Sequence, residues 1–268
     1  MGVNTAFFTG VDLTLASSVT GSPWIRGAAG QITLTISNAG SVTSTTNLLT
    51  VTATLPAGLA STGMSGTGWT TNASGLSCTR TNTLTAGASH PIITLNVAVA
   101  SNAAATLQPT FTLSGGGDAY ASNNTITQTI ATITPADSWR AQYFGSSDNT
   151  GPGADTNAPA GDGISNLMKY ALGITNVLTP ATQGLPEIKM TNNRLAITFN
   201  RQKSATDIIY EVQAAGDLFG FSNATVLWSS ASNAYGGGTN ASESVTVQDP
   251  VDATSTNRRF MRLQVSRP

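Results

Sequence analysis

The chain has 268 residues, of which 40% are hydrophobic and only 9% are charged, and its formal net charge is −1. This length suffices for two domains of ordinary size, and the composition excludes a chain kept disordered by charge repulsion. The few basic side chains form no patch that could neutralise phosphates, and we therefore exclude a nucleic-acid-binding protein. No apolar run reaches the roughly 18 residues that span a bilayer, so we expect no membrane span.

The N-terminal segment, residues 1–10, lacks the basic start and long apolar stretch of a signal peptide. It contains two adjacent aromatic residues, Phe7 and Phe8. We interpret it as an arm that adds as a donor strand to a neighbouring chain.

The region from Val11 to Ile133 is almost free of charge, with only Asp12, Arg26, Arg80 and Asp118. Its apolar residues recur with a period of two in short segments, and glycine, proline and asparagine mark turns between them. This pattern predicts an antiparallel β-sandwich over residues 11–134. The predicted strands are Asp12–Ala16, Gln31–Ser37, Leu49–Leu55, Ile92–Val99, Thr110–Leu113 and Thr125–Ile133.

Residues 135–184 differ in texture, because they carry aromatic residues, more charge and a helical pattern. Apolar residues recur at helical spacing between 164 and 172, and Gly173 can end a helix in the left-handed conformation. We therefore predict a connector with one short helix, about 164–172. The apolar stripe comprises Ile164, Leu167, Met168, Ala171 and Leu172.

Strand patterns return in residues 185–268, which we predict to form a smaller β domain. The fold class predicted for the whole chain is all-β, with two immunoglobulin-like β-sandwich domains joined by the connector. The predicted strands of the second domain are Glu187–Met190, Arg194–Asn200, Ile208–Ala214, Thr225–Ser229, Ser242–Val247 and Arg259–Val265.

The first region contains an ordered set of motifs: Leu55-Pro-Ala-Gly-Leu59, Gly66-Thr-Gly-Trp69, Leu76-Ser-Cys-Thr-Arg80, Leu84-Thr-Ala-Gly-Ala88, and Ser114-Gly-Gly-Gly-Asp118 with Asn123-Asn124. This ordered set resembles the bacterial extracellular immunoglobulin-like repeat known as "domain of unknown function eleven". The resemblance implies an immunoglobulin-like sandwich of surface and secreted proteins. It also implies a disulfide that this chain cannot form, since Thr71 stands where the first cysteine would be and Cys78 is the only cysteine.

The C-terminal half contains further motifs, which include Trp139-Arg-Ala-Gln-Tyr-Phe-Gly145, Gly161-Asp-Gly163, Asn166-Leu-Met-Lys-Tyr-Ala-Leu-Gly173, Tyr210-Glu-Val and Arg258-Arg-Phe-Met-Arg-Leu263. These motifs resemble a C-terminal module of secreted and surface proteins of Verrucomicrobia-like bacteria. The resemblance implies a location more than an activity. On both resemblances we expect an extracellular or cell-surface protein whose signal peptide has been removed.

In the module's family, the Gly-Asp-Gly segment sits in a calcium loop of EF-hand type, which needs oxygen ligands at positions 1, 3, 5 and 12. With Asp162 at position 5, the other three positions hold Ala158, Ala160 and Lys169. Oxygens of a different set could still bind calcium, which is the one cofactor we consider. The candidate ligands are Asp155, Asn157, Asp162 and Asn166. The alternative is that these side chains cap the helix and bond the loop backbone.

Catalytic groups are scarce in this sequence. His90 is the only histidine, no nucleophile elbow is present, and we interpret His90 as an exposed loop residue. The densest acidic cluster is Asp207, Glu211 and Asp217. Along a strand, the first two are about 13 Å apart, too far for a glycosidase pair, so we interpret them as solvated strand-end charges. We expect no enzyme.

Each of the four tryptophans is a candidate sugar-stacking platform. Trp69 and Trp139 lie inside the motifs, which favours packing, whereas Trp24 follows a Gly-Ser-Pro turn and is the candidate exposed platform. The sequence thus predicts a non-catalytic extracellular structural protein, a surface stalk or self-assembling filament-type subunit that uses β-strand addition. The alternative is a carbohydrate-binding or adhesion module with a glycan or cell-surface partner.

Overall fold

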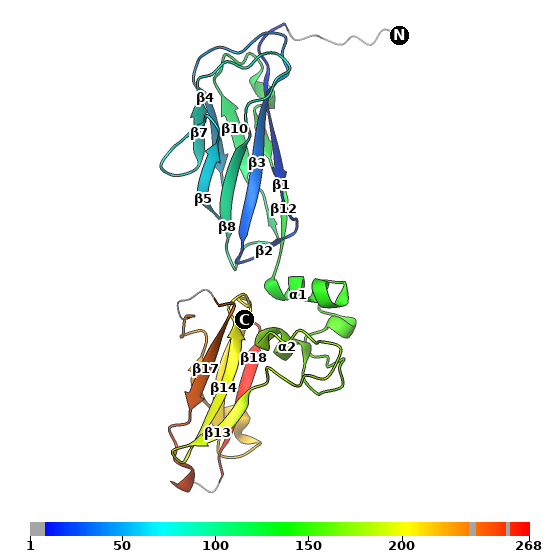
Figure 1. The fold of residues 1–268 in the computed structure, drawn as a ribbon, viewed down its shortest axis with the longest axis vertical. Helices are drawn as coiled ribbons and strands as arrows, with labels where there is room; N and C mark the ends of the chain where they lie inside the picture. The colour runs from blue at the N-terminus through cyan, green and yellow to red at the C-terminus, as the bar shows by residue number, and fades with distance from the viewer. Residues whose placement is uncertain (1–8, 236–239, 256–257) are drawn as a thin grey trace. The chain divides into compact units, whose positions relative to one another are not determined.

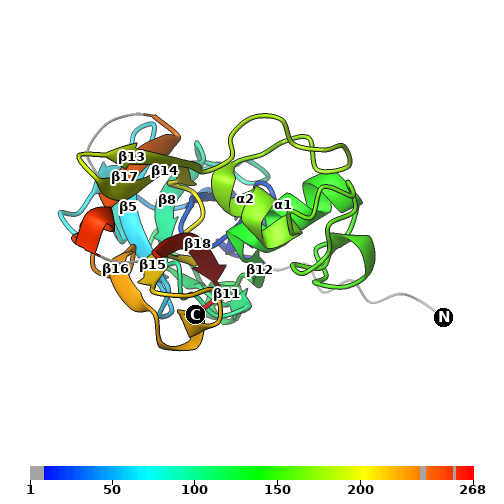
Figure 2. The same cartoon turned by 90° about the horizontal axis from the view of Figure 1, so that it is seen from below.

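The computed structural model describes residues 9–235, 240–255 and 258–268. Contacts divide the chain into two compact units, residues 1–133 and 134–268, each with its own hydrophobic core. The predicted all-β class is confirmed, because strands build most of both cores and the described residues hold only two short α-helices (Figures 1 and 2).

The first unit is a sandwich of two antiparallel sheets, ordered β1-β3-β8-β5 and β11-β10-β4-β7-β6, with a smaller sheet β2-β12-β9. Side chains alternate along β3, so that Ile32, Leu34 and Ile36 enter the core. The strands are β1 (Leu13–Val19), β2 (Trp24–Ile25), β3 (Ala29–Asn38), β4 (Leu49–Thr54), β5 (Leu59–Gly66), β6 (Thr70–Thr71), β7 (Ser77–Arg80), β8 (Ile93–Val99), β9 (Thr106–Leu107), β10 (Thr110–Ser114), β11 (Thr125–Thr127) and β12 (Ile130–Ile133), with a 3-10 turn at Ala121–Asn123.

All strands predicted for this region are present, although Thr125–Ile133 divides into β11 and β12. The sequence pattern missed β5 and β7 and the two-residue strands. In β5 a bulge between Ser61 and Gly63 shifts the register against β8 and interrupts the alternation of side chains. A search for period two therefore passes over this strand.

The second unit packs two three-stranded sheets, β13-β14-β17 and β16-β15-β18, around a core that the helices share. Every strand predicted here is present. The elements are α1 (Pro135–Phe144), α2 (Asn166–Leu172), β13 (Glu187–Thr191), β14 (Arg194–Gln202), β15 (Ile209–Ala215), β16 (Thr225–Ser229), β17 (Ser242–Gln248) and β18 (Phe260–Ser266), with 3-10 turns at Gly151–Gly153, Gly220–Asn223 and Ala253–Ser255.

Helix α1 was not predicted, although its start carries a local signal. Thr134 caps the helix, its hydroxyl accepting from the Asp137 amide while the Asp137 carboxylate accepts from the Thr134 amide. The predicted helix corresponds to α2, which starts at residue 166 because Ser165 is its cap. Core residues come from α1 and α2 as well as from the strands. The segment predicted as a connector is therefore part of the second unit.

Candidate functional site

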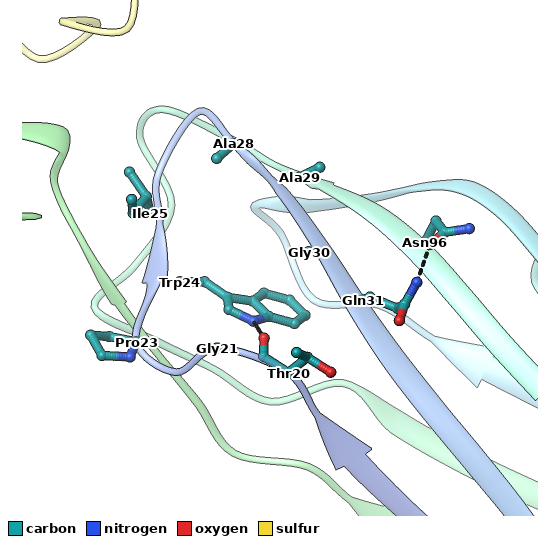
Figure 3. A pocket seen from close by; sticks show the side chains of 10 residues that line it. All are labelled: Thr20, Gly21, Pro23, Trp24, Ile25, Ala28, Ala29, Gly30, Gln31 and Asn96. Atoms are coloured by element: carbon teal, nitrogen blue, oxygen red, sulfur yellow. Dashed lines mark hydrogen bonds between the residues drawn. The ribbon is translucent and has the colours of Figure 1, made fainter.

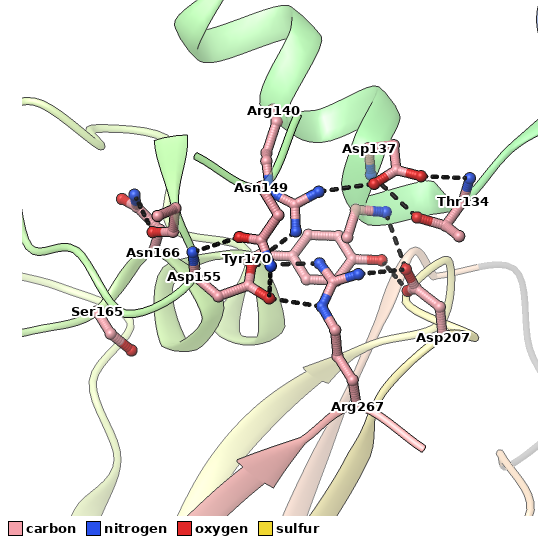
Figure 4. Close-up of polar contacts among 12 residues, drawn as sticks. Thr134, Asp137, Arg140, Asn149, Asp155, Ser165, Asn166, Tyr170, Asp207 and Arg267 are labelled. Atoms are coloured by element: carbon pink, nitrogen blue, oxygen red, sulfur yellow. Dashed lines mark hydrogen bonds and ion pairs between the residues drawn. The ribbon is translucent and has the colours of Figure 1, made fainter. Parts of the chain in front are cut away.

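A chain of ion pairs crosses the second unit (Figure 4). The guanidinium of Arg140, on α1, is fully buried and lies 2.7 Å from both Asp137 Oδ1 and Asp155 Oδ1. Arg267, in the C-terminal tail after β18, pairs with Asp155 at 2.6 Å and lies 3.9 Å from Asp207. These pairs join α1, the loop after it and the C-terminal end of the chain.

Asp207 links this chain of ion pairs to α2. The Tyr170 hydroxyl donates to Asp207 Oδ1 at 2.6 Å, and the Ala136 amide donates to Oδ2 at 3.1 Å. Burial and then the bond to Asp207 raise the pKa of Tyr170. The side chain of Asp207 is only 12% exposed, so its interpretation as a solvated strand-end charge is wrong. Its oxygens hold the fold together and are not free for acid–base chemistry.

The predicted calcium ligands face cations and backbone groups of the chain itself. Lys169 is buried, and its ammonium lies 2.8 Å from Asp162 Oδ2 and 3.3 Å from the Val177 carbonyl oxygen. The hydrogen bond from Lys169 is the main reason that the pKa of Asp162 falls to about 2. A lysine ammonium thus stands beside the carboxylate that a calcium loop would present to the metal.

The remaining candidate ligands are also engaged. Asp155 faces two arginines, and the Asn157 amide group donates to the Gly151 carbonyl. The Asn166 amide group donates to the carbonyls of Pro152 and Ala154, as the capping and backbone-bonding alternative expects. Among the described residues, no three acidic, histidine or cysteine side chains gather as metal ligands. In this arrangement the four side chains do not fit a calcium ion, and calcium binding stays a prediction.

Trp24 lines a hollow of about 460 Å³ in the first unit (Figure 3) but offers no stacking face. The residue is 4% exposed, and its indole Nε1 donates to the Thr20 carbonyl at 3.0 Å. The ring lies against Gly30, where an added Cβ would approach it to 2.6 Å. The expectation of an exposed Trp24 is therefore wrong, because the turn folds the ring inward.

His90 is buried as well, contrary to its interpretation as an exposed residue. Its ring packs edge-on against Trp69 with centroids 5.6 Å apart. Burial, and then the nearby charge of Arg80, lower the pKa of His90. The interaction places His90 in the packing of the first unit rather than in a proton relay.

Cys78 lies directly across from Thr71 on the neighbouring strand. The thiol is buried, and its sulfur is 3.3 Å from the Thr71 hydroxyl. The two positions of the implied disulfide are therefore adjacent, with a hydroxyl in place of one sulfur. Phe7 and Phe8 lie outside the described residues.

A groove that the sequence did not indicate lies in the second unit. One part, of about 180 Å³, is lined by aromatic rings of both helices, and a second, of about 360 Å³, is lined mainly by amides and hydroxyls. The two pockets adjoin, because they share four lining residues, and we call the pair the aromatic–amide groove. Its lining comprises Trp139, Tyr143, Tyr170, Leu172, Gly173, Ile174, Thr175, Asn176, Gln183, Gly184, Asn200, Gln202, Ser204 and Ser242.

Gly173 lines both parts of the groove. It ends α2 with a φ of 70°, a conformation that favours glycine, and a Cβ there would meet the Gln202 amide nitrogen at 2.1 Å. Gln202 was just outside the predicted end of its strand. Only the fold brings this amide beside rings that are distant in the sequence.

No family model and no curated protein matches this chain. Solved structures match it distantly: a CARDB domain from Pyrococcus furiosus is 12% identical, with 47% of this chain and 92% of that chain covered and a TM-score of 0.31. A collagen-binding domain from a Staphylococcus aureus adhesin is 10% identical, with coverages of 46% and 99% and a TM-score of 0.30. A cohesin module from Clostridium perfringens is 10% identical, with coverages of 47% and 98% and a TM-score of 0.28. None of the described helices is long and apolar enough to cross a membrane.

Proposed function

We propose that the protein is a non-catalytic extracellular structural protein whose copies associate by β-strand addition at the first unit. The resemblance of the first region to surface and secreted repeats supports this location. The absence of catalysis is supported by the buried ionisable groups, because they are held in ion pairs. Arg140, Lys169 and Arg201 are buried, and each is paired with a carboxylate. Buried charges held in this way stabilise a structure and leave few groups to transfer protons.

The observation that carries the proposal is the free edge of β1. The Asp12 carbonyl bonds the Ala39 amide beside β3, whereas the Leu13 amide points away from β3 and bonds Asp118. Since backbone groups alternate in direction along a strand, those of Leu15, Ser17 and Val19 also point outward. Within the described residues no hydrogen bond reaches these outward groups.

This edge also lacks the usual protection against pairing. Strand β1 has the sequence Leu-Thr-Leu-Ala-Ser-Ser-Val, with neither charge nor proline. Charged side chains and prolines are the common means of keeping an edge strand from adding another strand. Strand β13, an edge of the second unit, instead carries Glu187 and Lys189. The proposal therefore takes β1, rather than a charged edge such as β13, as the strand to which another strand adds.

A pair of identical substitutions tests this proposal. Ala16→Lys places a charge on the edge strand β1, and Ala98→Lys places the same charge on β8, in the interior of the same sheet. Both alanine side chains are exposed, so neither lysine must be buried. We expect sedimentation velocity to show concentration-dependent oligomers of the natural chain and of Ala98→Lys, and mainly monomers of Ala16→Lys.

Removal of residues 1–8 tests whether the arm is the added strand. If the arm pairs with β1 of a neighbour, the shortened chain stays monomeric where the full chain associates. A full chain that sediments as a monomer up to high concentration contradicts association altogether. If the full and shortened chains associate equally, β1 can still be the edge that is joined, but the arm is not the strand that adds to it.

A further inference from the structure

The geometry points to a second role for this protein: the aromatic–amide groove binds a neutral carbohydrate. This goes beyond the proposed function, because the groove lies in the second unit and does not involve the strand edge of the first. The proposal rests on the aromatic rings, the unused amide and the absence of charge in the lining.

The aromatic end offers rings that are only partly buried. Trp139 and Tyr143 lie one helical turn apart on α1, with ring centroids separated by 5.3 Å, and both are partly exposed. Tyr170 of α2 packs against Trp139 with ring centroids 5.7 Å apart, and Tyr170 is itself 6% exposed. A pyranose ring has an apolar face of C–H groups, which packs on the face of an aromatic side chain. A fixed aromatic pair beside a groove suits that contact.

The amide end offers hydrogen-bonding groups that the fold does not use. Within the described residues the side-chain amide of Gln202 has no hydrogen-bond partner, and it lies against Gly173 between the two parts of the groove. Gln202 is directly opposite Ser242, and Asn200 is opposite Ser244, on the adjoining strand. An amide carries both a donor and an acceptor, as does each sugar hydroxyl, so these groups match a polyhydroxylated ligand.

The lining also selects against charged ligands. Among the described residues, its polar members carry phenol, amide or hydroxyl groups, and none is acidic or basic. An anionic sugar, phosphate or nucleic acid would lose hydration in this groove without gaining a counter-charge. A neutral hexose or pentose polymer faces no such cost. The groove therefore favours neutral over acidic saccharides.

Native affinity electrophoresis of the full chain tests the proposal. The gels contain mixed-linkage glucan, galactomannan or arabinoxylan as neutral polymers, and alginate as the acidic comparison. We expect retardation by at least one neutral polymer and none by alginate. Tyr143→Ala should weaken binding on the order of tenfold and Gln202→Ala by about fivefold, as loss of one stacking or hydrogen-bonding contact does.

Gln31→Ala is the matched control for Gln202→Ala. Gln31 lines the hollow of the first unit, where its amide donates to Asn96 Oδ1 at 3.1 Å, and its removal should leave retardation unchanged. Circular dichroism establishes that each variant is folded. Because the Gln202 amide makes no internal bond, this variant should fold even if Tyr143→Ala does not.

The proposal is overturned if none of the neutral polymers retards the folded chain, if alginate retards it more strongly, or if Gln202→Ala binds as the natural chain does. Reducing-end analysis of the same incubations tests the proposed function separately. New chain ends would contradict a non-catalytic protein, whereas absence of retardation without new ends would reject only the groove.

Discussion

The two units of this molecule satisfy their polar groups in different ways. In the first, hydroxyls and amides bond the sandwich, as where Thr71 donates to the Met64 carbonyl and Ser61 to the Gly75 carbonyl. In the second, buried guanidinium and ammonium groups tie the two helices to the loop between them and join β14 to β17. Two regular sheets already fix the first unit, whereas the long segment between α1 and β13 has little regular structure. Fixed charges hold that segment, and with it the groove.

Loss of the buried arginine should have the largest effect. Arg140→Met keeps the length of the side chain but leaves the Asp137 carboxylate without its ion pair and Asp155 with Arg267 as its one remaining cation. Breaking a buried pair in this way costs about 3–5 kcal/mol. We expect the second unit to unfold at lower urea, as followed by hydrogen exchange of its peptides, while β3 and β8 of the first unit keep their stability.

The control for Arg140→Met removes a cation from an exposed pair. Lys189 and Glu187 lie 2.8 Å apart with side chains 66% and 58% exposed. Such pairs contribute about 0–1 kcal/mol, so Lys189→Met should barely move the transition. Similar losses in the two variants would show that the buried network does not hold the second unit.

The first unit should respond to a covalent link. Thr71→Cys places a second thiol across from Cys78, where the hydroxyl already lies 3.3 Å from the sulfur. Closing a loop of this length should stabilise the unit by about 2–3 kcal/mol. Thermal unfolding with and without reductant measures the gain, and Thr71→Ser provides the hydroxyl control. A variant that keeps two free thiols under oxidising conditions would contradict the strand pairing.

Acid should lower the stability of the second unit more than that of the first, gradually and by a smaller amount than the changes above. Hydrogen bonding to Lys169 lowers the pKa of Asp162 to about 2. Burial alone would raise the pKa of Asp137, but hydrogen bonds with Thr134 and Arg140 lower it below its ordinary value. A carboxyl with a lower pKa in the folded state binds protons more weakly there than when unfolded. Its contribution to stability is complete above about pH 4 and is lost as the pH falls toward 2.

We therefore expect the second unit to lose stability between pH 4 and 2 while the first, with two acidic residues in its sandwich, changes little. Hydrogen exchange of peptides from each unit at pH 7 and pH 2.5, corrected for the intrinsic rate, measures the difference. Equal losses in both units would mean that the ion pairs do not distinguish them.

These contrasts also explain what the sequence could predict. The strands follow from the period of two, because one face of each sheet is buried. Helix α1 was missed even though Thr134, Pro135 and Asp137 form a recognisable start, since its apolar stripe is poor. Trp24 and His90 were misplaced because tertiary packing, not the local turn, decides their burial.

The groove could not be read from the sequence at all. Its aromatic rings come from α1 and α2, and its amides come from β14 and the loops beside it, with no shared motif. The sequence favours packing for Trp139, and its ring is partly buried against the core of the second unit. The Arg140–Asp155 pair was equally invisible, because its partners meet only after the intervening loop has folded.

Hydrogen-exchange mass spectrometry of the natural chain over a concentration series tests the central claim, association at the edge of the first unit, most directly. Strand addition to β1 would give the outward amides of Leu15, Ser17 and Val19 new partners. We predict that exchange in Leu13–Val19 slows as concentration rises, while exchange in Glu187–Thr191 stays constant. Exchange in β1 that does not depend on concentration, or protection that appears at β13 instead, would contradict the account.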